Sequence, residues 1–399
     1  MHDKKGKWRA GWLLIIVLLI MTGCSKPSAE ETRVPTQAAT AEATTTATAT
    51  PQPTAVPSVP ETETRISLSA IGDVLIHSSV WKDARKEDGS YDFRPMFQQV
   101  KEKLEATDIT FANSESIIGG ESLGLSSYPA FNSPFEVGDA LKDAGVDIVS
   151  MANNHTLDFR EKAIVQAADH WDKLGILFAG ANRSEEERNR IRIIERKGVK
   201  IAFLAYTYGT NGIPVPAGKE YLVNLLDKDR LIADIRQAKQ EADAVVVSMH
   251  WGIEYARIPN EEQRQWAQLA ADEGAAVVIG HHPHVLQPVE WVQGKDGNRT
   301  LVFYSLGNFL AAQEKLDPYR QIGGIARMDL VFKHSASGTE VSVENPGILP
   351  TYIQFRNWKG YRIVPLHTAS LEILPERSKY EKDTLQLLTK YMPELSVGE

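Results

Sequence analysis

The chain has 399 residues, of which 42% are hydrophobic, and a formal net charge of −8 at pH 7. This length and hydrophobic content are sufficient for one large domain with a buried core. The acidic balance argues against a protein that binds phosphate backbones over a broad surface, so we expect no nucleic-acid partner. The sequence contains a single cysteine, which excludes disulfides within the chain and zinc sites built from several cysteines.

The first 24 residues have the features of a bacterial lipoprotein signal peptide. Basic residues precede an apolar run over residues 12–21, which is shorter than the ~20 residues that a transmembrane helix needs. The run ends in Met-Thr-Gly-Cys, which resembles a lipobox with Cys24 as the lipidated residue. An uncleaved signal anchor is the alternative interpretation. Both interpretations place the rest of the chain outside the cytoplasmic membrane, and lipidation would hold it at the membrane surface.

Residues 25–64 are rich in Thr, Ala, Pro and Ser and are predicted to form a disordered spacer. Such a segment buries too little apolar surface to offset the entropy lost on ordering, and its prolines favour extended conformations. We therefore expect the main domain over residues 65–333, followed by a C-terminal strand and helix extension over residues 334–399.

Short apolar segments alternate with amphipathic ones from residue 65 onward. The predicted strands are residues 66–71, 109–112, 147–151, 200–205, 244–249, 275–279, 300–304 and 327–332, and in the extension 347–355 and 361–365. The predicted helices are residues 95–106, 134–144, 160–174, 228–241, 260–273 and 376–391. Strands separated by helices of about 10 to 15 residues indicate parallel pairing and a layered α/β fold.

Polar side chains follow five of the predicted strands, at the point where each strand ends. They are Asp73 and His77, then Asn113 and Glu115, then Asn153, Asn154 and His155, then His250, and finally His281, His282 and His284. Each alone has a simple structural explanation as a turn residue, a helix cap or a core histidine. Because ligands of open α/β sheets bind outside the carboxyl ends of the strands, we expect these side chains to converge. Their recurrence predicts a metal site.

The residue types also restrict the metal. Imidazole, carboxylate and amide ligands without thiolate suit Mn²⁺, Fe²⁺ or Zn²⁺. The candidates outnumber the ligands of one tetrahedral ion, so we expect two divalent ions. Such a pair activates water and stabilises the entering and leaving oxygens of a displacement. Binding should weaken in mild acid, because the histidine ligands must be neutral.

Several short motifs occur in a fixed order between residues 66 and 329. They are GDVLIH, NSE, ANNHTLD, SMHWGIEY, GHHPHVLQPVE and YSLGNF. Together they resemble the CapA family of capsule-synthesis proteins, a branch of the calcineurin-like metallophosphoesterase superfamily. This resemblance implies a four-layer α/β/β/α sandwich, in which two sheets pack face to face with helices outside.

The resemblance also implies roles for individual residues. The metal ligands would be Asp73, His77, Glu115, Asn154, His250, His282 and His284, with Asp73 on the first ion, Asn154 and His250 on the second, and Glu115 as the bridge. His155 would protonate the leaving group or stabilise charge in the transition state, while His281, Asn153 and Asn113 would be auxiliary or substrate-binding residues. The sequence departs from the family pattern in three places. Three residues rather than one separate Asp73 from His77, Glu115 replaces an aspartate, and Arg160 stands where the family often has a glycine.

Two functional classes remain open. The resemblance implies a role in poly-γ-glutamate capsule synthesis or export, within a membrane-bound synthesis complex. The alternative is a metal-dependent hydrolase that cleaves phosphoester or amide bonds in an anionic polymer of the cell envelope. A degenerate relative without chemistry is a third class, against which the near-complete ligand set argues. An acidic polymer requires cationic partners, and bound metals with Arg257, Arg320 and Arg327 are the candidates.

Overall fold

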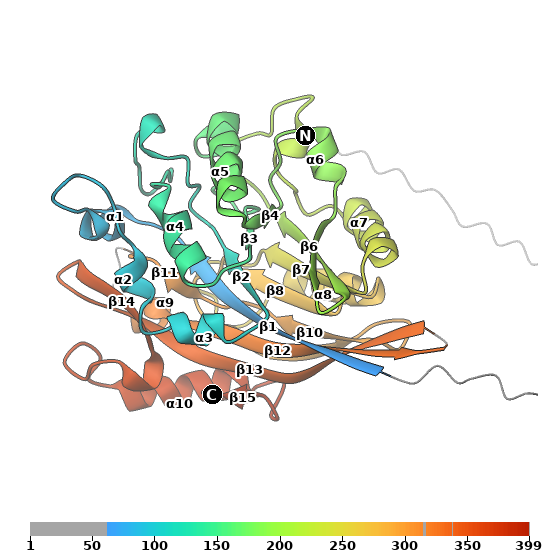
Figure 1. The fold of residues 1–399 in the computed structure, drawn as a ribbon. Coiled ribbons are helices and arrows are strands. Elements are labelled where there is room, and N and C mark those ends of the chain that lie inside the picture. The colour runs from blue at the N-terminus through green and yellow to red at the C-terminus, as the bar shows by residue number, and fades with distance from the viewer. Residues whose placement is uncertain (1–61, 314–316, 337, 399) are drawn as a thin grey trace, which may run out of the picture. The chain divides into compact units, whose positions relative to one another are not determined.

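Two β-sheets form the centre of the protein in a computed structural model, which describes residues 62–313, 317–336 and 338–398 (Figure 1). The predicted signal peptide, Cys24 and the predicted spacer up to residue 61 lie outside the described residues. None of the helices within the described ranges is long and apolar enough to cross a membrane.

The first sheet has the strand order β14-β13-β12-β1-β2-β3-β4, with β11 paired to β1 and β15 to β13. Its strands are β1 (Thr62–Val74), β2 (Ile109–Asn113), β3 (Ile148–Ser150), β4 (Leu177–Ala179), β11 (Asn308–Leu310), β12 (Ile322–Ser335), β13 (Gly338–Arg356), β14 (Lys359–Pro365) and β15 (Ser396–Val397). Strands β1 to β4 are parallel, as predicted, whereas the pairs β1–β12, β12–β13 and β13–β14 are antiparallel. In Figure 1, β1 (blue) runs beside β12 (orange), although the two are far apart in the chain.

The second sheet has the order β5-β6-β7-β8-β10-β9. Its strands are β5 (Arg192–Arg196), β6 (Val199–Thr207), β7 (Ala244–His250), β8 (Val277–His281), β9 (Val289–Gln293) and β10 (Arg299–Phe303). The four central strands are parallel, and an antiparallel strand closes each edge. The predicted parallel pairing is therefore confirmed for the core of both sheets.

Helices cover the outer face of each sheet. The first sheet is covered by α1 (Ser78–Ala84), α2 (Arg94–Phe97), α3 (Lys101–Glu105), α4 (Glu136–Asp143) and α5 (Arg160–Leu174), and the second by α7 (Lys228–Glu241) and α8 (Glu261–Asp272). The remaining helices are α6 (Glu185–Asn189), α9 (Pro318–Gln321), α10 (Arg377–Leu388) and the short 3₁₀ helices η1 (Glu121–Leu123), η2 (Glu220–Leu222) and η3 (Leu366–Thr368). Helix α8 begins with a capping box, in which Asn260 and Gln263 exchange hydrogen bonds of 2.8 and 3.0 Å.

The core of the protein lies in three apolar layers. Between the sheets, Phe111 of β2 stacks on Phe203 of β6 with ring centroids 6.2 Å apart. Side chains alternate along each strand, so Val246 of β7 faces the first sheet while Val247 faces the helices. Trp171 of α5 is fully buried against the outer face of the first sheet. The resulting order of helices, sheet, sheet and helices confirms the four-layer sandwich.

The structure differs from the predicted elements in a few places. The predicted helix over residues 95–106 is two short helices, α2 and α3, because a tight hydrogen bond from the amide of Val100 to the carbonyl of Phe97 interrupts it. Strands β4, β5, β9, β11 and β15 were not predicted. Strands β4 and β11 have three residues each and β15 has two, while β5 and β9 are half-exposed edge strands with charged residues.

The predicted domain boundaries need two corrections. Strand β1 begins at Thr62, because residues 62–64, assigned to the spacer, pair with the far end of β12. The boundary between residues 333 and 334 falls inside the antiparallel pair of β12 and β13. The C-terminal extension therefore continues the first sheet, and all described residues belong to one compact unit.

Candidate metal centre

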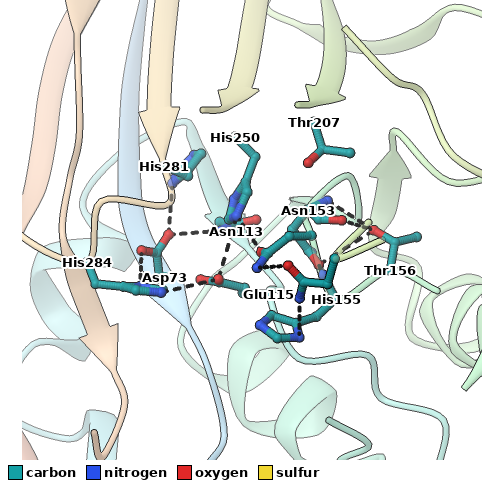
Figure 2. A network of polar contacts seen from close by, with 12 residues as sticks. Asp73, Asn113, Glu115, Asn153, His155, Thr156, Thr207, His250, His281 and His284 are labelled. Carbon is teal, nitrogen blue, oxygen red and sulfur yellow. Dashed lines mark hydrogen bonds and ion pairs between the residues drawn. The ribbon is translucent and has the colours of Figure 1, made fainter. Parts of the chain in front are cut away.

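The predicted polar residues come together where β1, β2, β3, β7 and β8 end (Figure 2). The backbone is tightly packed at this edge. A side chain at Gly72 would overlap the carbonyl oxygen of Gly307, which accepts a hydrogen bond of 2.8 Å from the amide of Asp73. Gly280 similarly lies against the carbonyl of Tyr304. These glycines allow neighbouring loops to approach closely enough for side chains of both sheets to meet.

The turn after β8 holds its histidines in an unusual conformation. His282 and His284 have φ angles of +96° and +57°, in the left-handed region that side chains other than glycine rarely adopt. Such residues cost on the order of 1–3 kcal/mol each and often occur at functional sites. Here the strained turn places both imidazoles beside Glu115.

Two groups of donor atoms lie at this edge, and within each group the atoms are within 4.8 Å of one another. The first group joins Asp73, Glu115 and His250, and the second joins Glu115, His282 and His284. Oδ2 of Asp73 also lies 3.0 Å from Nδ1 of His284, so the two groups are contiguous. Glu115 belongs to both groups, as a bridging carboxylate would. Asp73 and His250 share a group, whereas the family resemblance implied separate ions for them.

Buried polar atoms without partners show that these residues fit metal ions. Among the described residues, no hydrogen-bond partner exists for either carboxylate oxygen of Glu115, for Nδ1 of His250 or for Nδ1 of His282. All three residues are buried, and Glu115 is 0% exposed. Buried polar groups are normally satisfied, and a divalent ion would satisfy several of these at once.

Asn154 extends the first donor group. Its Oδ1 lies 2.8 Å from Nε2 of His250, while its Nδ2 donates a hydrogen bond of 3.1 Å to Asn211. The contact with Asn211 orients the amide so that its oxygen faces His250. Two ligand atoms of one ion lie about 3 Å apart, so this pair has the separation expected of shared coordination.

The charges at the centre are strongly coupled. Burial disfavours the charged form of His284, but Glu115 and Asp73 outweigh burial and raise the pKa of His284 to about 9. Burial and the charge of Asp73 raise the pKa of Glu115 well above its usual range. Burial lowers the pKa of His282 to about 3 and lowers that of His250 as well. Two histidines are thus held neutral, which is the form that binds metals.

Three of the predicted histidines, His77, His155 and His281, lie outside both donor groups. His77 caps the start of α1, because the three-residue spacing from Asp73 carries it beyond the strand end, and its Nδ1 accepts a hydrogen bond of 3.1 Å from the amide of Ala312. His281 ends β8, where its ring stacks on Phe111 at 5.9 Å and its Nδ1 lies 3.5 Å from Oδ1 of Asp73. The structure therefore places His281 closer to the donor groups than His77.

His155 is paired with an aspartate that the sequence analysis did not single out. Nδ1 of His155 lies 2.7 Å from Oδ2 of Asp158, which also accepts a hydrogen bond of 2.7 Å from the amide of Phe131. A carboxylate fixed in this way orients the imidazole and leaves Nε2 as its free nitrogen. The spacing of three residues within one turn was the signal that could have identified Asp158.

The two auxiliary asparagines position other residues. Nδ2 of Asn113 donates a hydrogen bond of 2.9 Å to Oδ1 of Asp73. Oδ1 of Asn153 accepts a hydrogen bond of 2.9 Å from the amide of His155, while its Nδ2 donates to the carbonyl of Ser114. These contacts are of the kind that holds ligands and proton donors in place.

A cleft of about 620 Å³ opens beside the centre. Its lining includes His77, His155, His284, Glu254, Tyr255, Arg320, Tyr128 and Trp358. Of the three arginines proposed from the sequence, only Arg320 lines this cleft. Arg257 lies over the ring of Tyr319, and Arg327 donates a hydrogen bond to the carbonyl of Lys103. The cleft connects solvent to the side of the donor groups where His155 and His284 lie.

Tyr208 is a further neighbour of the centre that sequence reasoning missed. It is 45% exposed, and its ring lies 4.7 Å from that of His282 and 6.4 Å from that of His250. No pattern in the sequence separates this tyrosine from an ordinary surface residue, because it lies in a loop after β6.

Comparison with known proteins supports the family resemblance. The chain is 31% identical over 258 residues to "PGA biosynthesis protein CapA" of Bacillus subtilis (strain 168), covering 62% of this chain and 64% of that protein. It is 29% identical over 276 residues to "Capsule biosynthesis protein CapA" of Bacillus anthracis, covering 65% of this chain and 63% of that protein. The matches thus span less than two thirds of the length of these relatives.

Among solved structures, Haemophilus influenzae NAD nucleotidase (NadN) is similar at a TM-score of 0.45 and 13% sequence identity, over 84% of this chain and 64% of that chain. The family model described as "Bacterial capsule synthesis protein PGA_cap" matches residues 67–313, a segment that contains every strand end of the centre. The chain therefore belongs to the bacterial capsule synthesis protein family PGA_cap.

Proposed function

We propose that this protein acts in the synthesis or export of a poly-γ-glutamate capsule through a centre for two divalent metal ions, of Mn, Fe or Zn. The observation that carries this proposal is the buried Glu115, which two contiguous donor groups share beside an open cleft. Relatives named for PGA and capsule biosynthesis supply the polymer.

The donor groups indicate how the ions would be held. One ion would be bound by Asp73, Glu115 and His250 with Asn154, and the other by Glu115, His282 and His284. Divalent ions bound there would polarise a substrate carbonyl or phosphoryl oxygen and neutralise charge that develops on it.

The protein's own residues would handle the proton and the orientation of the substrate. Asp158 holds the ring of His155 at 2.7 Å, so Nε2 of His155 is available at the cleft to hold or deliver a proton. Asn153 fixes the backbone of His155 through a hydrogen bond of 2.9 Å. Burial of Glu115 and His250 keeps bulk water away from the donor groups, which strengthens the electrostatic interactions there.

A second candidate function is hydrolysis of an anionic polymer of the cell envelope, at phosphoester or amide bonds. The pair of His155 and Asp158 favours it, because a histidine oriented by a carboxylate is suited to proton transfer, which binding alone does not require. In this case the protein would trim or release the polymer.

We further propose that lipidation of Cys24 anchors the protein to the outer side of the cell membrane, beside a membrane-bound synthesis complex. The support is the lipobox-like motif of the sequence. The test is metabolic labelling with a fatty-acid analogue, which should label the wild type but not a Cys24→Ala variant.

One experiment separates the two candidate functions. The purified protein, loaded with Mn²⁺ and checked for metal by elemental analysis, is incubated with poly-γ-glutamate and with an aryl phosphate. Polymer binding without a change in polymer length supports the accessory role in synthesis or export. Shortening of the polymer that depends on His155 supports the hydrolase. If the metal-loaded protein neither binds nor cleaves poly-γ-glutamate, the proposed polymer is wrong.

A further inference from the structure

Arg320 is a cation beside the donor groups that has no acidic partner among the described residues. Within the described part of the chain, its guanidinium forms no ion pair or hydrogen bond, and its Nε is buried without a partner. It lines the same cleft as His155 and His284. An unpaired guanidinium in a cleft presents several donors in a fixed plane, which matches carboxylate or phosphate oxygens.

The position of Arg320 is fixed by the loops that form the metal centre. Its guanidinium lies 3.4 Å from the centroid of the Tyr255 ring. Tyr255 has a φ angle of +65°, and its amide donates a hydrogen bond of 2.7 Å to the carbonyl of Pro283, inside the histidine turn. Nδ2 of Asn308 lies 2.7 Å from the carbonyl of Arg320 and 3.3 Å from that of His284. The arginine is therefore held in place before any ligand arrives.

Aromatic side chains complete the cleft. Tyr128 is 74% exposed, and Trp358 is 37% exposed and stacks on Phe355 with ring centroids 5.2 Å apart. Both line the cleft that contains Arg320. A γ-linked glutamate chain alternates a carboxylate with a short apolar segment of two methylene groups, so a cleft lined by a cation and by aromatic side chains suits both parts of its repeat.

We propose that Arg320, Tyr128 and Trp358 form a subsite for a carboxylate-bearing polymer, separate from the metal ligands. In this subsite Arg320 binds a carboxylate of the polymer. This inference rests on the proposed function, which supplies the polymer. A polymer bound at this subsite would have its adjacent repeat units next to the donor groups and His155.

Glu254 provides an internal contrast, because it lines the same cleft with the opposite charge. No ion pair joins it to Arg320. The carboxylate of Glu254 repels an anionic polymer, so neutralising Glu254 should strengthen polymer binding, whereas loss of Arg320 should weaken it. The same kind of substitution at the two residues therefore has opposite expected effects.

The test measures binding of a fluorescent poly-γ-glutamate oligomer to the full-length, Mn²⁺-loaded protein by anisotropy. Arg320→Gln should weaken binding about tenfold, as expected for loss of a charge-assisted hydrogen bond, and should reduce its salt dependence. Arg320→Lys should recover part of the loss. Glu254→Gln should tighten binding about two- to threefold. Arg257→Gln is the matched control and should bind as the wild type does, because Arg257 lies over Tyr319 outside the cleft lining.

Metal content and thermal unfolding of each variant show whether the centre and the fold are intact. If Arg320→Gln binds the oligomer as tightly as the wild type with metal content unchanged, the subsite is wrong while the proposed function stands. If the wild type fails to bind the oligomer, the proposed polymer itself is wrong. Binding of polyphosphate in place of the oligomer, dependent on Arg320, would overturn the assignment to a carboxylate.

Discussion

Glu115 is the residue on which the proposed centre depends most. Its two carboxylate oxygens are buried and form no hydrogen bond among the described residues, Oε1 lies 3.6 Å from Nε2 of both His250 and His284, and Glu115 belongs to both donor groups. We predict that Glu115→Gln, which preserves shape but removes the charge, weakens metal binding by more than about 100-fold, since loss of an outer partner alone costs about 10–100-fold. Elemental analysis after dialysis against a buffered metal solution measures this. Glu254→Gln should retain the wild-type metal content, and equal retention by Glu115→Gln would refute the bridging role.

Asp158 acts through His155. The variant Asp158→Ala should release the ring from its fixed tautomer and orientation, because it removes the carboxylate oxygen that lies 2.7 Å from Nδ1 of His155. If the protein is a hydrolase, turnover should fall by about 10²- to 10⁴-fold, the usual contribution of a general acid or base. Nitrogen NMR of the His155 ring should show the changed tautomer even without turnover, and the metal content should not change. An unaltered ring spectrum would contradict the assigned role.

The residue types at the centre were predictable from the sequence, but their grouping was not. Asp73, Glu115 and His250 stand out because each follows an apolar strand, and parallel strands end at a common edge. Which of them share donor groups depends on contacts between the two sheets, and these have no local signature. His77 is an example of what the sequence does not show. It follows a strand, as predicted, but it lies at the start of α1, where its ring accepts a hydrogen bond from the amide of Ala312 and lies outside both donor groups.

At the level of elements, the short helix α6 is joined to α7 by a buried ion pair. Arg188 donates a hydrogen bond of 2.6 Å to Asp234, which also accepts one of 2.6 Å from the hydroxyl of Tyr206. We predict that Arg188→Met lowers the free energy of unfolding by about 3–5 kcal/mol, because it leaves the aspartate buried without its cation. Urea denaturation followed by circular dichroism measures this change.

The same helix provides the control for that prediction. Arg190 pairs with Glu186 at 3.4 Å, with side chains that are 64% and 87% exposed. Arg190→Met should change the free energy of unfolding by less than about 1 kcal/mol, as is usual for surface ion pairs. Similar effects at Arg188 and Arg190 would show that burial of the first pair does not govern its contribution.

The elements themselves were largely predictable, because strands buried on both faces appear as continuous apolar runs bounded by turn residues. Strand β7 is an example, with Val245 and Val246 facing opposite layers. The assignment of strands to two sheets was not predictable, since no local pattern shows that β4 and β6 belong to different sheets. The long antiparallel pair of β12 and β13 was missed for a related reason, because β13 begins with exposed residues that resemble a loop.

At the scale of the whole molecule, the centre should make stability depend on pH once metal is removed. Burial lowers the pKa of His77 to about 4, that of His282 to about 3 and that of His250 well below its usual value. These histidines stay neutral in the folded protein but take up protons on unfolding below pH 6.5, so stability falls as the pH falls. Glu115 has a raised pKa, so above the ordinary pKa of a glutamate it stays protonated in the folded protein and releases its proton on unfolding. This opposes the effect of the histidines by at most one proton. His284, with a pKa of about 9, stays protonated in the folded protein, whereas the unfolded chain is only about half protonated there at pH 6.5, so His284 opposes the three histidines by about half a proton at pH 6.5 and by almost none at pH 5.

As the pH falls below 6.5, the three histidines outweigh Glu115 and the diminishing contribution of His284, so the net effect has a definite sign. We predict that the free energy of unfolding of the EDTA-treated protein decreases between pH 6.5 and pH 5, with an upper limit of about 1.4 kcal/mol per pH unit for each net proton. Urea denaturation at half-unit pH steps measures the slope, and His77→Asn, which removes one of the buried histidines, should reduce it. Addition of Mn²⁺ should raise stability most at pH 6.5 and progressively less toward pH 5, because protons compete with the metal for the imidazoles. If the free energy of unfolding in EDTA does not change with pH, the histidines are already solvated in the metal-free protein, and the buried metal centre described above is wrong.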